Sequence, residues 1–283
     1  MKPSAAEIRQ AVRRALAEDL GRGDATTLAT ISRTAAARAV LRAREPIVVA
    51  GIRFAEAAFC ALSKKIRIEK AARDGQRAGA GSILLGLSGP ARAILSAERV
   101  ALNFLQRLSG VATLTAQFVA ARRGARAQIL DTRKTTPGWR RFEKYAVACG
   151  GGKNHRLGLD DMILIKDNHL AALRHEKPNA IAAAVARARR KFPKLQIEVE
   201  ADTLEQLHQA LEAGAEIILL DNMDLKTLRQ AVKIARGRAK TEASGGVNLR
   251  TVGAIARTGV DFISVGALTH SAPAVDIGLD FEK

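Results

Sequence analysis

Residues 196–221 read QIEVEADTLEQLHQALEAGAEIILLD, and this stretch decides the fold. Its two apolar runs, Gln196–Glu200 and Ile217–Asp221, have the length and composition of buried strands. Between them, Thr203 fits the start of a helix and Gly214 fits its end. A strand, a helix and a second strand in this order predict parallel strands joined by a right-handed crossover.

The same alternation extends in both directions along the second half of the chain. Asp224 and Gly237 bound one further predicted helix, and Asn248 and Gly259 bound another. Alternating strands and helices of this kind fit a barrel or an open α/β sheet. Six strands can be identified, and a seventh is compatible with the pattern. The predicted strands are Gln128–Asp131, Met162–Lys166, Gln196–Glu200, Ile217–Asp221, Lys240–Ala243 and Phe262–Val265.

The first half has a mixed α+β pattern. In Ala5–Leu20 the apolar residues Ile8, Val12, Leu16 and Leu20 fall on one stripe, which predicts an amphipathic helix. The other predicted segments are an extended Ala35–Ala50, a helix at Phe54–Leu62, a strand at Ile66–Lys70, a Gly/Ser-rich bend at Gly79–Gly89, and a helical Pro90–Arg122 interrupted near Ser109-Gly110.

The composition is that of a soluble globular protein. Of 283 residues, 47% are hydrophobic and 26% are charged. No apolar run reaches the roughly 20 residues that span a bilayer, and Met1 to Gln10 has no signal-peptide core. Cys60 and Cys149 are the only cysteines, which indicates neither a disulfide framework nor a zinc cluster and favours the cytoplasm.

The net charge of +18 is concentrated in the first half of the chain. Residues 1–130 hold 22 Lys and Arg against 9 Asp and Glu, and residues 131–283 hold 24 against 19. Such a charge favours nucleic acid or small polyanionic substrates, unless it reflects only a basic proteome. With aromatic residues at 4%, including one Trp and one Tyr, the stacking surface of a nucleic-acid-binding module is not expected.

Polar or Gly-rich residues follow each predicted strand of the second half. Because barrels and α/β sheets build their sites at the carboxyl ends of strands, we expect these residues to form one site. They are Asp131 with Thr132-Arg133-Lys134, Lys166, Glu200, Asp221, Ser244-Gly245-Gly246 and Gly266-Ala267.

Two kinds of ligand are indicated by these strand ends. Turns such as Ser244–Gly246 and Val265–Ala267 hold phosphate through backbone N–H groups. Glu200 and Asp221 supply oxygen ligands suited to Mg²⁺ with substrate phosphates, although a pair of buried salt bridges is the alternative. His155 and Arg156 lie in a Gly-rich loop among cations, which favours anion binding, and His169 could orient a neighbour.

Longer motifs cover essentially the whole chain, and together they resemble the quinolinate phosphoribosyltransferase family. The most specific is Asp131-Thr132-Arg133-Lys134-Thr135-Thr136-Pro137-Gly138. The others include Glu18–Asp24, Glu98-Arg99, Asn103, Leu108–Gly110, Glu143–Val147, Cys149–Gly152, Asn154–Leu159, Ile165–His169, Glu198–Glu200, Leu220–Asn222 and Gly259–Thr269.

The resemblance implies a fold and an assembly. The fold is an N-terminal α/β sandwich domain plus an incomplete seven-stranded α/β barrel of the type II phosphoribosyltransferase kind. It implies a sandwich at residues 1–110, joined by the tail 269–283, and a barrel at residues 111–268. It also implies a homodimer with shared active sites, in which Arg99 reaches the partner's site, and it leaves a hexamer open.

The resemblance further implies the reaction and its residues. Phosphoribosyl transfer from phosphoribosyl pyrophosphate to quinolinate, with decarboxylation, would give nicotinate mononucleotide for NAD biosynthesis. It assigns catalysis to Lys134, Lys166, Glu200 and Asp221, and Mg²⁺ to Glu200 and Asp221, through pyrophosphate or water. The implied substrate-binding residues are Arg99, Thr132, Arg133, Lys134, His155, Arg156, Lys166, Glu200, Asp221, Ser244, Gly245, Gly246, Val265, Gly266 and Ala267.

Two other functions remain as alternatives. One is the homologue found with molybdate-transport genes, which typically changes the Lys166-Asp167-Asn168-His169 run that is intact here. The other is a phosphate-binding barrel enzyme of another pathway. No residue in the sequence identifies the proton donor that follows decarboxylation, and neither nucleic acid nor a membrane is an expected partner.

Overall fold

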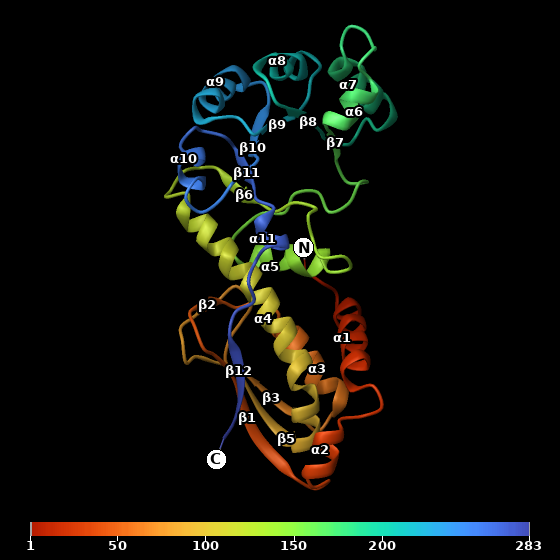
Figure 1. Ribbon diagram of the computed structural model, residues 1–283, viewed down its shortest axis with the longest axis vertical. Helices are drawn as coiled ribbons and strands as arrows, with labels where there is room; N and C mark the ends of the chain where they lie inside the picture. Colours follow the sequence, from red (N-terminus) through yellow and green to blue (C-terminus); the bar gives the residue numbers. More distant parts are fainter. Residues whose placement is uncertain (1, 283) are drawn as a thin grey trace. The chain divides into compact units, whose positions relative to one another are not determined.

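The computed structural model describes residues 2–282 and divides into two compact units (Figure 1). The first unit comprises the chain up to Ala116, Thr136–Gly151, and the chain from Ser271 onward. The second comprises Gln117–Thr135 and Gly152–His270. The domain bounds expected from the sequence stay a prediction.

The first unit is built on a four-stranded antiparallel sheet in the order β12-β1-β5-β3. Its strands are β1 (Ala36–Ala43), β3 (Arg67–Lys70), β5 (Ile83–Pro90) and β12 (Ile277–Phe281). A two-stranded ribbon adds β2 (Ile47–Val48) and β4 (Arg77–Ala78). The helices are α1 (Ala5–Leu20), α2 (Ala25–Thr30), α3 (Ile52–Leu62), the long α4 (Ala91–Ala121) and α5 (Arg140–Cys149).

Helix α1 has the bounds that the sequence predicts. Ser4 and Glu7 form a capping box at its start, with the Ser4 hydroxyl accepting from Glu7 N at 3.2 Å. Ile8, Val12 and Leu16 are buried, and α1 packs against α3. The apolar stripe therefore faces the interior, as an amphipathic helix requires.

Two expectations for the first unit are wrong. The predicted bend at Gly79–Gly89 contains strand β5, whose glycines accommodate a close neighbour, since a Cβ on Gly89 would lie 3.0 Å from Ile66 Cα. Helix α4 also continues without a break through Ser109-Gly110. Here the Ser109 hydroxyl bonds to the backbone of Ala50, and Gly110 leaves room for the backbone at residue 273. Gly and Ser thus mark close packing and not chain breaks.

The second unit is a parallel sheet with the strand order β6-β11-β10-β9-β8-β7. The strands are β6 (Gln128–Leu130), β7 (Ile163–Ile165), β8 (Ile197–Ala201), β9 (Ile217–Asp221), β10 (Lys240–Ser244) and β11 (Phe262–Ser264). The helices are α6 (Asp167–Ala172), α7 (Ala180–Lys191), α8 (Leu204–Glu212), α9 (Leu225–Ala235), α10 (Val252–Ala256) and α11 (Ala267–His270). Thr203 and Asp224 cap α8 and α9 as predicted.

A short extended segment at Lys153 lies beside β6, at one edge of this six-stranded sheet. Lys153 forms an isolated parallel bridge with Leu130 of β6, using Lys153 N to Ile129 O at 2.8 Å and Asp131 N to Lys153 O at 3.2 Å. In the described residues β7 pairs only with β8, and no pair joins it to the Lys153 segment. The α/β barrel is therefore incomplete, as expected.

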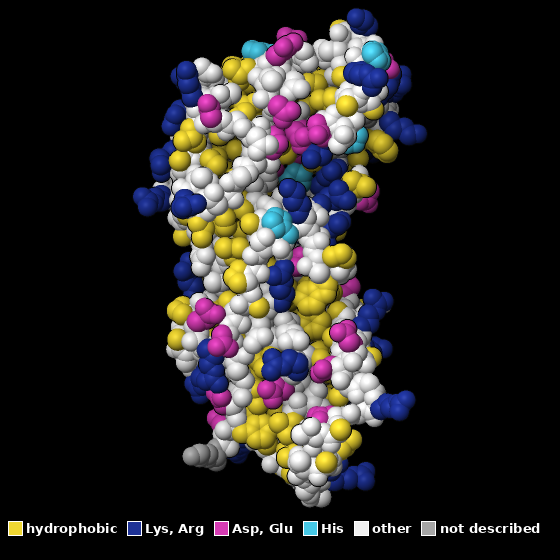
Figure 2. Space-filling view, viewed as in Figure 1, with side chains coloured by type: hydrophobic (Ala, Val, Ile, Leu, Met, Phe, Trp, Pro, Cys, Tyr) yellow, Lys and Arg dark blue, Asp and Glu magenta, His cyan; other side chains and the backbone are white. Residues whose placement is uncertain are grey.

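The surface carries cations in many places. In Figure 2, Lys and Arg side chains are scattered among acidic and apolar ones over the visible face, without a continuous basic stripe. Within residues 2–282, no helix combines the length and the apolar character needed to cross a membrane.

Candidate active site

Most of the residues expected at strand ends line one cavity in the second unit. Its volume is about 370 Å³. The lining residues are Thr132, Arg133, Lys134, His155, Arg156, Leu164, Lys166, Glu200, Leu219, Asp221, Glu242, Ser244 and Ser264. Gly245-Gly246 and Val265–Ala267 directly follow two of them in the chain. Arg99 is exposed on α4 in the first unit.

Arg133, Arg156 and Lys166 give this cavity the positive charge that an anionic ligand needs. Arg133 Nε is buried, yet it has no hydrogen-bond partner among the described residues. Burial and then the charge of Arg133 lower the pKa of Arg156, although its guanidinium remains a cation. Lys166 Nζ lies 3.1 Å from Glu200 Oε2 with its side chain about half-exposed. A bound anion would satisfy the buried donor and relieve the repulsion between the guanidinium groups.

Two carboxylates come from neighbouring strands. Glu200 lies near the end of β8 and Asp221 ends β9, and these strands pair with Glu200 opposite Leu219. Asp221 Oδ2 accepts from Asn222 Nδ2 at 2.7 Å. Oxygen donors on adjacent strand ends, with space beside them in the cavity, fit Mg²⁺ carried by a phosphate-containing substrate.

The turn after β10 contains two consecutive glycines, Gly245 and Gly246, which have no side chains to cover the backbone. Gly245 has φ +93° and Gly246 has φ +58°, and a Cβ on Gly245 would lie 2.0 Å from Asn222 Oδ1. Gly266 is also crowded, since its Cβ would lie 3.0 Å from His270 Nε2. Glycine at these positions lets the backbone N–H groups of both turns lie close to a ligand, which is the arrangement that binds phosphate.

His155 is held from three sides within its own unit. The Asp131 carboxylate accepts from His155 N at 2.9 Å and from Asn154 Nδ2 at 2.6 Å. The backbone N–H of Arg156 donates to His155 Nδ1 at 2.8 Å, and His155 Nε2 lies 2.9 Å from Glu198 Oε2. His155 therefore fixes the loop that carries Arg156, and its own contact with a substrate stays a prediction.

Two buried acids in this region were not expected as site residues. Glu198 and Glu242 have relative exposures of 0% and 1%, and one ligand atom from each lies within 4.8 Å of one from His155. Burial, followed by the neighbouring Glu198 carboxylate, raises the pKa of Glu242. Glu198 stands two residues before Glu200 on the same face of a buried strand, which is the one signal in the sequence that could have revealed an acidic interior.

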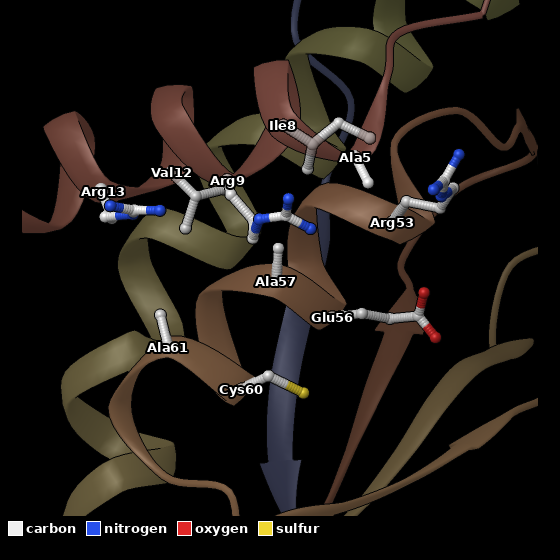
Figure 3. Close-up of a pocket in the computed structure, with 10 residues that line it drawn as sticks. All are labelled: Ala5, Ile8, Arg9, Val12, Arg13, Arg53, Glu56, Ala57, Cys60 and Ala61. Atoms are coloured by element: carbon white, nitrogen blue, oxygen red, sulfur yellow. The ribbon is translucent and has the colours of Figure 1, made fainter.

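A larger cavity in the first unit lacks this chemistry. It is about 480 Å³ in volume and lies between α1 and α3, where Ile8, Val12 and Ala57 form an apolar floor (Figure 3). Its charged lining consists of three arginines and Glu56. Because it offers no histidine and no Gly-rich turn, the strand-end cavity is the candidate active site.

Comparison with known proteins gives the same assignment for both halves of the chain. Residues 24–109 match the model of the quinolinate phosphoribosyl transferase N-terminal domain, and residues 111–280 match that of its C-terminal domain. The nicotinate-nucleotide pyrophosphorylase [carboxylating] of Mycobacterium leprae is 44% identical over 281 residues, which are 96% of each chain. The probable enzyme of that name from Bacillus subtilis is 42% identical over 264 residues, covering 93% of this chain and 89% of its own.

A solved structure extends the similarity to three dimensions. The nicotinate-nucleotide pyrophosphorylase of Francisella tularensis superposes with a TM-score of 0.93 at 40% identity, over 99% of this chain and 98% of its own. Sequence models, curated relatives and a solved structure thus agree over nearly the full length, and the chain belongs to the quinolinate phosphoribosyltransferase family.

Proposed function

We propose that this protein transfers the phosphoribosyl group of phosphoribosyl pyrophosphate to quinolinate and decarboxylates the product. The products would be nicotinate mononucleotide, carbon dioxide and pyrophosphate, in NAD biosynthesis. The observation that carries the proposal is the strand-end cavity, where a buried Arg133 Nε lacks a partner beside Arg156 and Lys166. Family membership over both halves of the chain supports it.

The two carboxylates of quinolinate fit the cations of the cavity. Arg133 and Arg156 present planar forks that bind carboxylates bidentately, and Lys166 adds a compact charge. His155 would keep the Arg156 loop in place, since it accepts the Arg156 backbone N–H. Nicotinate has one carboxylate, so it would leave part of this buried positive charge without a partner.

Phosphoribosyl pyrophosphate would bind at the carboxyl ends of β8, β9, β10 and β11. The turns Ser244–Gly246 and Val265–Ala267 would bind the 5′-phosphate through backbone N–H groups. Glu200 and Asp221 would hold the ribose and magnesium-pyrophosphate, with Lys134 and Thr132 facing the same anions. Bound Mg²⁺ supplies Lewis-acid stabilisation of the leaving pyrophosphate.

The reaction needs positioning and charge stabilisation and no nucleophilic side chain. The ring nitrogen of quinolinate attacks the anomeric carbon as pyrophosphate leaves, through a transition state with oxocarbenium character. Lys134 would stabilise the charge that develops on the leaving group. The carboxylate beside the ring nitrogen is then lost as carbon dioxide.

The proposed assembly is a homodimer with shared active sites, in which Arg99 of one subunit serves the site of the other. Its support is the exposed position of Arg99 on α4, far in sequence from the strand-end residues. The proposed location is the cytoplasm, on the basis of the two free cysteines, Cys60 and Cys149.

The experiment that tests the proposed function compares co-substrates. Purified protein with phosphoribosyl pyrophosphate and Mg²⁺ is given quinolinate or nicotinate, and the nucleotide product is identified by mass spectrometry. We expect nicotinate mononucleotide from quinolinate, and a kcat/KM for nicotinate lower by about 100-fold or more. Comparable turnover of nicotinate would overturn the assignment of the substrate.

A further inference from the structure

Two buried acids and a partly buried histidine form a cluster at the active-site cavity, and the chemistry described above does not use the two acids. His155, Glu198 and Glu242 come from the loop after α5, from β8 and from β10. His155 Nε2 lies 2.9 Å from Glu198 Oε2 and 3.8 Å from Glu242 Oε2. Neither oxygen of Glu242 has a hydrogen-bond partner among the described residues, and Glu198 Oε1 has none. An acid pair this deeply buried needs a proton or a cation.

The hydrogen bonds of His155 favour a proton. The backbone N–H of Arg156 donates to Nδ1, so Nδ1 is the unprotonated nitrogen and Nε2 carries the hydrogen that Glu198 accepts. A metal ion on Nε2 would require the hydrogen to move to Nδ1, where it would oppose the Arg156 N–H. The cluster therefore stores a proton and does not hold a metal.

Glu242 is the carboxyl group that keeps this proton. Glu198 Oε2 accepts from His155 Nε2 at 2.9 Å, whereas the nearer oxygen of Glu242 lies 3.8 Å from the same nitrogen. The groups that face Glu242 are Glu198 and Asp131, which favour the acid form, and His155 and Ser264, which favour the carboxylate. Burial has the largest effect and raises the pKa of Glu242, so the carboxyl group is neutral over a wider pH range than an exposed one.

The position of Glu242 gives the proton access to the substrate site. In the sheet register Glu242 of β10 pairs with Leu219 of β9, and Leu219 pairs with Glu200 of β8. All three residues line the cavity. Glu242 thus stands in the same row as Glu200, two strands away, and it lines the cavity that would bind quinolinate.

We propose that Glu242 donates the proton that replaces the departing carboxylate of quinolinate, an inference that rests on the proposed function. The bond between the ring carbon and the carboxylate breaks, carbon dioxide leaves, and the electron pair stays on the ring carbon beside the positively charged nitrogen. The O–H bond of Glu242 then breaks and a C–H bond forms on that carbon. Glu242 is left as a carboxylate, which water reprotonates before the next turnover.

The test separates the two chemical steps in a single turnover. Quinolinate labelled in the carboxylate beside the nitrogen is mixed with excess enzyme, phosphoribosyl pyrophosphate and Mg²⁺, and pyrophosphate and labelled carbon dioxide are followed by rapid quench. In Glu242→Gln we expect pyrophosphate to form while carbon dioxide release falls by about 100-fold, the usual contribution of a general acid. Quinolinate mononucleotide should accumulate, because an unprotonated carbanion recaptures carbon dioxide.

Further variants and the pH profile separate a proton donor from a structural residue. Glu242→Asp, which keeps an acid, should recover part of the carbon dioxide release, and Glu205→Gln on the exposed face of α8 should match wild type. Wild-type carbon dioxide release should fall as pH rises through the raised pKa of Glu242, and Glu242→Gln should lack this limb.

Two results would overturn the inference. One is equal loss of both products in Glu242→Gln, and the other is carbon dioxide release that keeps pace with pyrophosphate at every pH. Absence of both products in wild type would overturn the proposed function itself, and the inference with it.

Discussion

Gly245 occupies a backbone position where a side chain cannot be placed. Its φ is +93°, and an added Cβ would lie 2.0 Å from Asn222 Oδ1 and 2.9 Å from Asn222 N. In Gly245→Ala the turn must shift, so we expect the KM for phosphoribosyl pyrophosphate to rise by about tenfold or more. The KM for quinolinate should change much less.

Gly237→Ala is the matched control for this variant. Gly237 also has a positive φ, +76°, but an added Cβ meets nothing within 4 Å. It should cost about 1 kcal/mol in the free energy of unfolding and leave the KM near wild type. Equal KM effects in the two variants would contradict a phosphate-binding role for the Ser244–Gly246 turn.

The raised pKa of Glu242 also predicts a pH dependence of stability. Its acid form is favoured by folding, so its contribution to stability is complete below the ordinary Glu pKa and is lost as pH rises through the raised folded value. Between the ordinary pKa of Glu and the raised pKa of Glu242 in the folded protein, the free energy of unfolding falls by about 1.4 kcal/mol for each pH unit. Glu242→Gln, which mimics the neutral acid, should therefore gain stability relative to wild type as pH rises.

Urea unfolding at a series of pH values measures this difference. Glu205→Gln, on the exposed face of α8, serves as the control and should follow wild type. A constant stability difference between Glu242→Gln and wild type across the series would contradict a raised pKa of Glu242 in the folded protein.

At the residue scale the sequence predicts the ends of strands better than their interiors. Lys166, Glu200 and Asp221 are recognisable because each ends or directly follows an apolar run, and Arg133 lies two residues after Asp131, which ends another. Glu242 lies within Lys240–Ser244, a strand of mixed polarity, and nothing local indicates that it faces Glu198. That contact depends on the order of the strands in the sheet, which local periodicity does not specify.

At the scale of strands and helices, the adjacent ends of β8 and β9 predict a shared metal-dependent role. We expect the reaction to need Mg²⁺ or Mn²⁺, and Asp221→Asn to raise the Mg²⁺ concentration for half-maximal activity by about tenfold or more. Asp202→Asn, at an exposed position just after β8, should leave this concentration unchanged. Full activity in excess chelator, or an unaltered Mg²⁺ dependence in Asp221→Asn, would refute the role.

The elements of the second unit were easier to predict than those of the first. The βα units have separate signals for strand, cap and stop, so the sequence predicts Ile217–Asp221 with the bounds that the structure has. In β5, Gly86 and Gly89 make the strand hard to recognise in the sequence, because glycine is typical of bends. Their small size here allows close contacts with β3 and with Ile66. Contacts that are distant in sequence therefore account for the errors in the first unit.

At the scale of the whole molecule, a shared active site predicts complementation between inactive variants. Arg99→Ala and Lys166→Ala homodimers should each be folded and nearly inactive. Random subunit exchange makes about half of the dimers mixed, each with one intact site of two, so pyrophosphate release should return to roughly a quarter of wild type. If exchange is verified by native mass spectrometry and no activity returns, Arg99 does not serve the partner's site.

The proposed enzyme couples decarboxylation to phosphoribosyl transfer. A phosphate-binding barrel enzyme of another pathway would not show this coupling. The direct measurement follows pyrophosphate and labelled carbon dioxide released by the purified protein from quinolinate, phosphoribosyl pyrophosphate and Mg²⁺. We expect equal amounts of both products, and neither product when quinolinate or phosphoribosyl pyrophosphate is left out. Pyrophosphate release that does not depend on quinolinate, or the absence of carbon dioxide from the wild-type reaction, would contradict the proposed function.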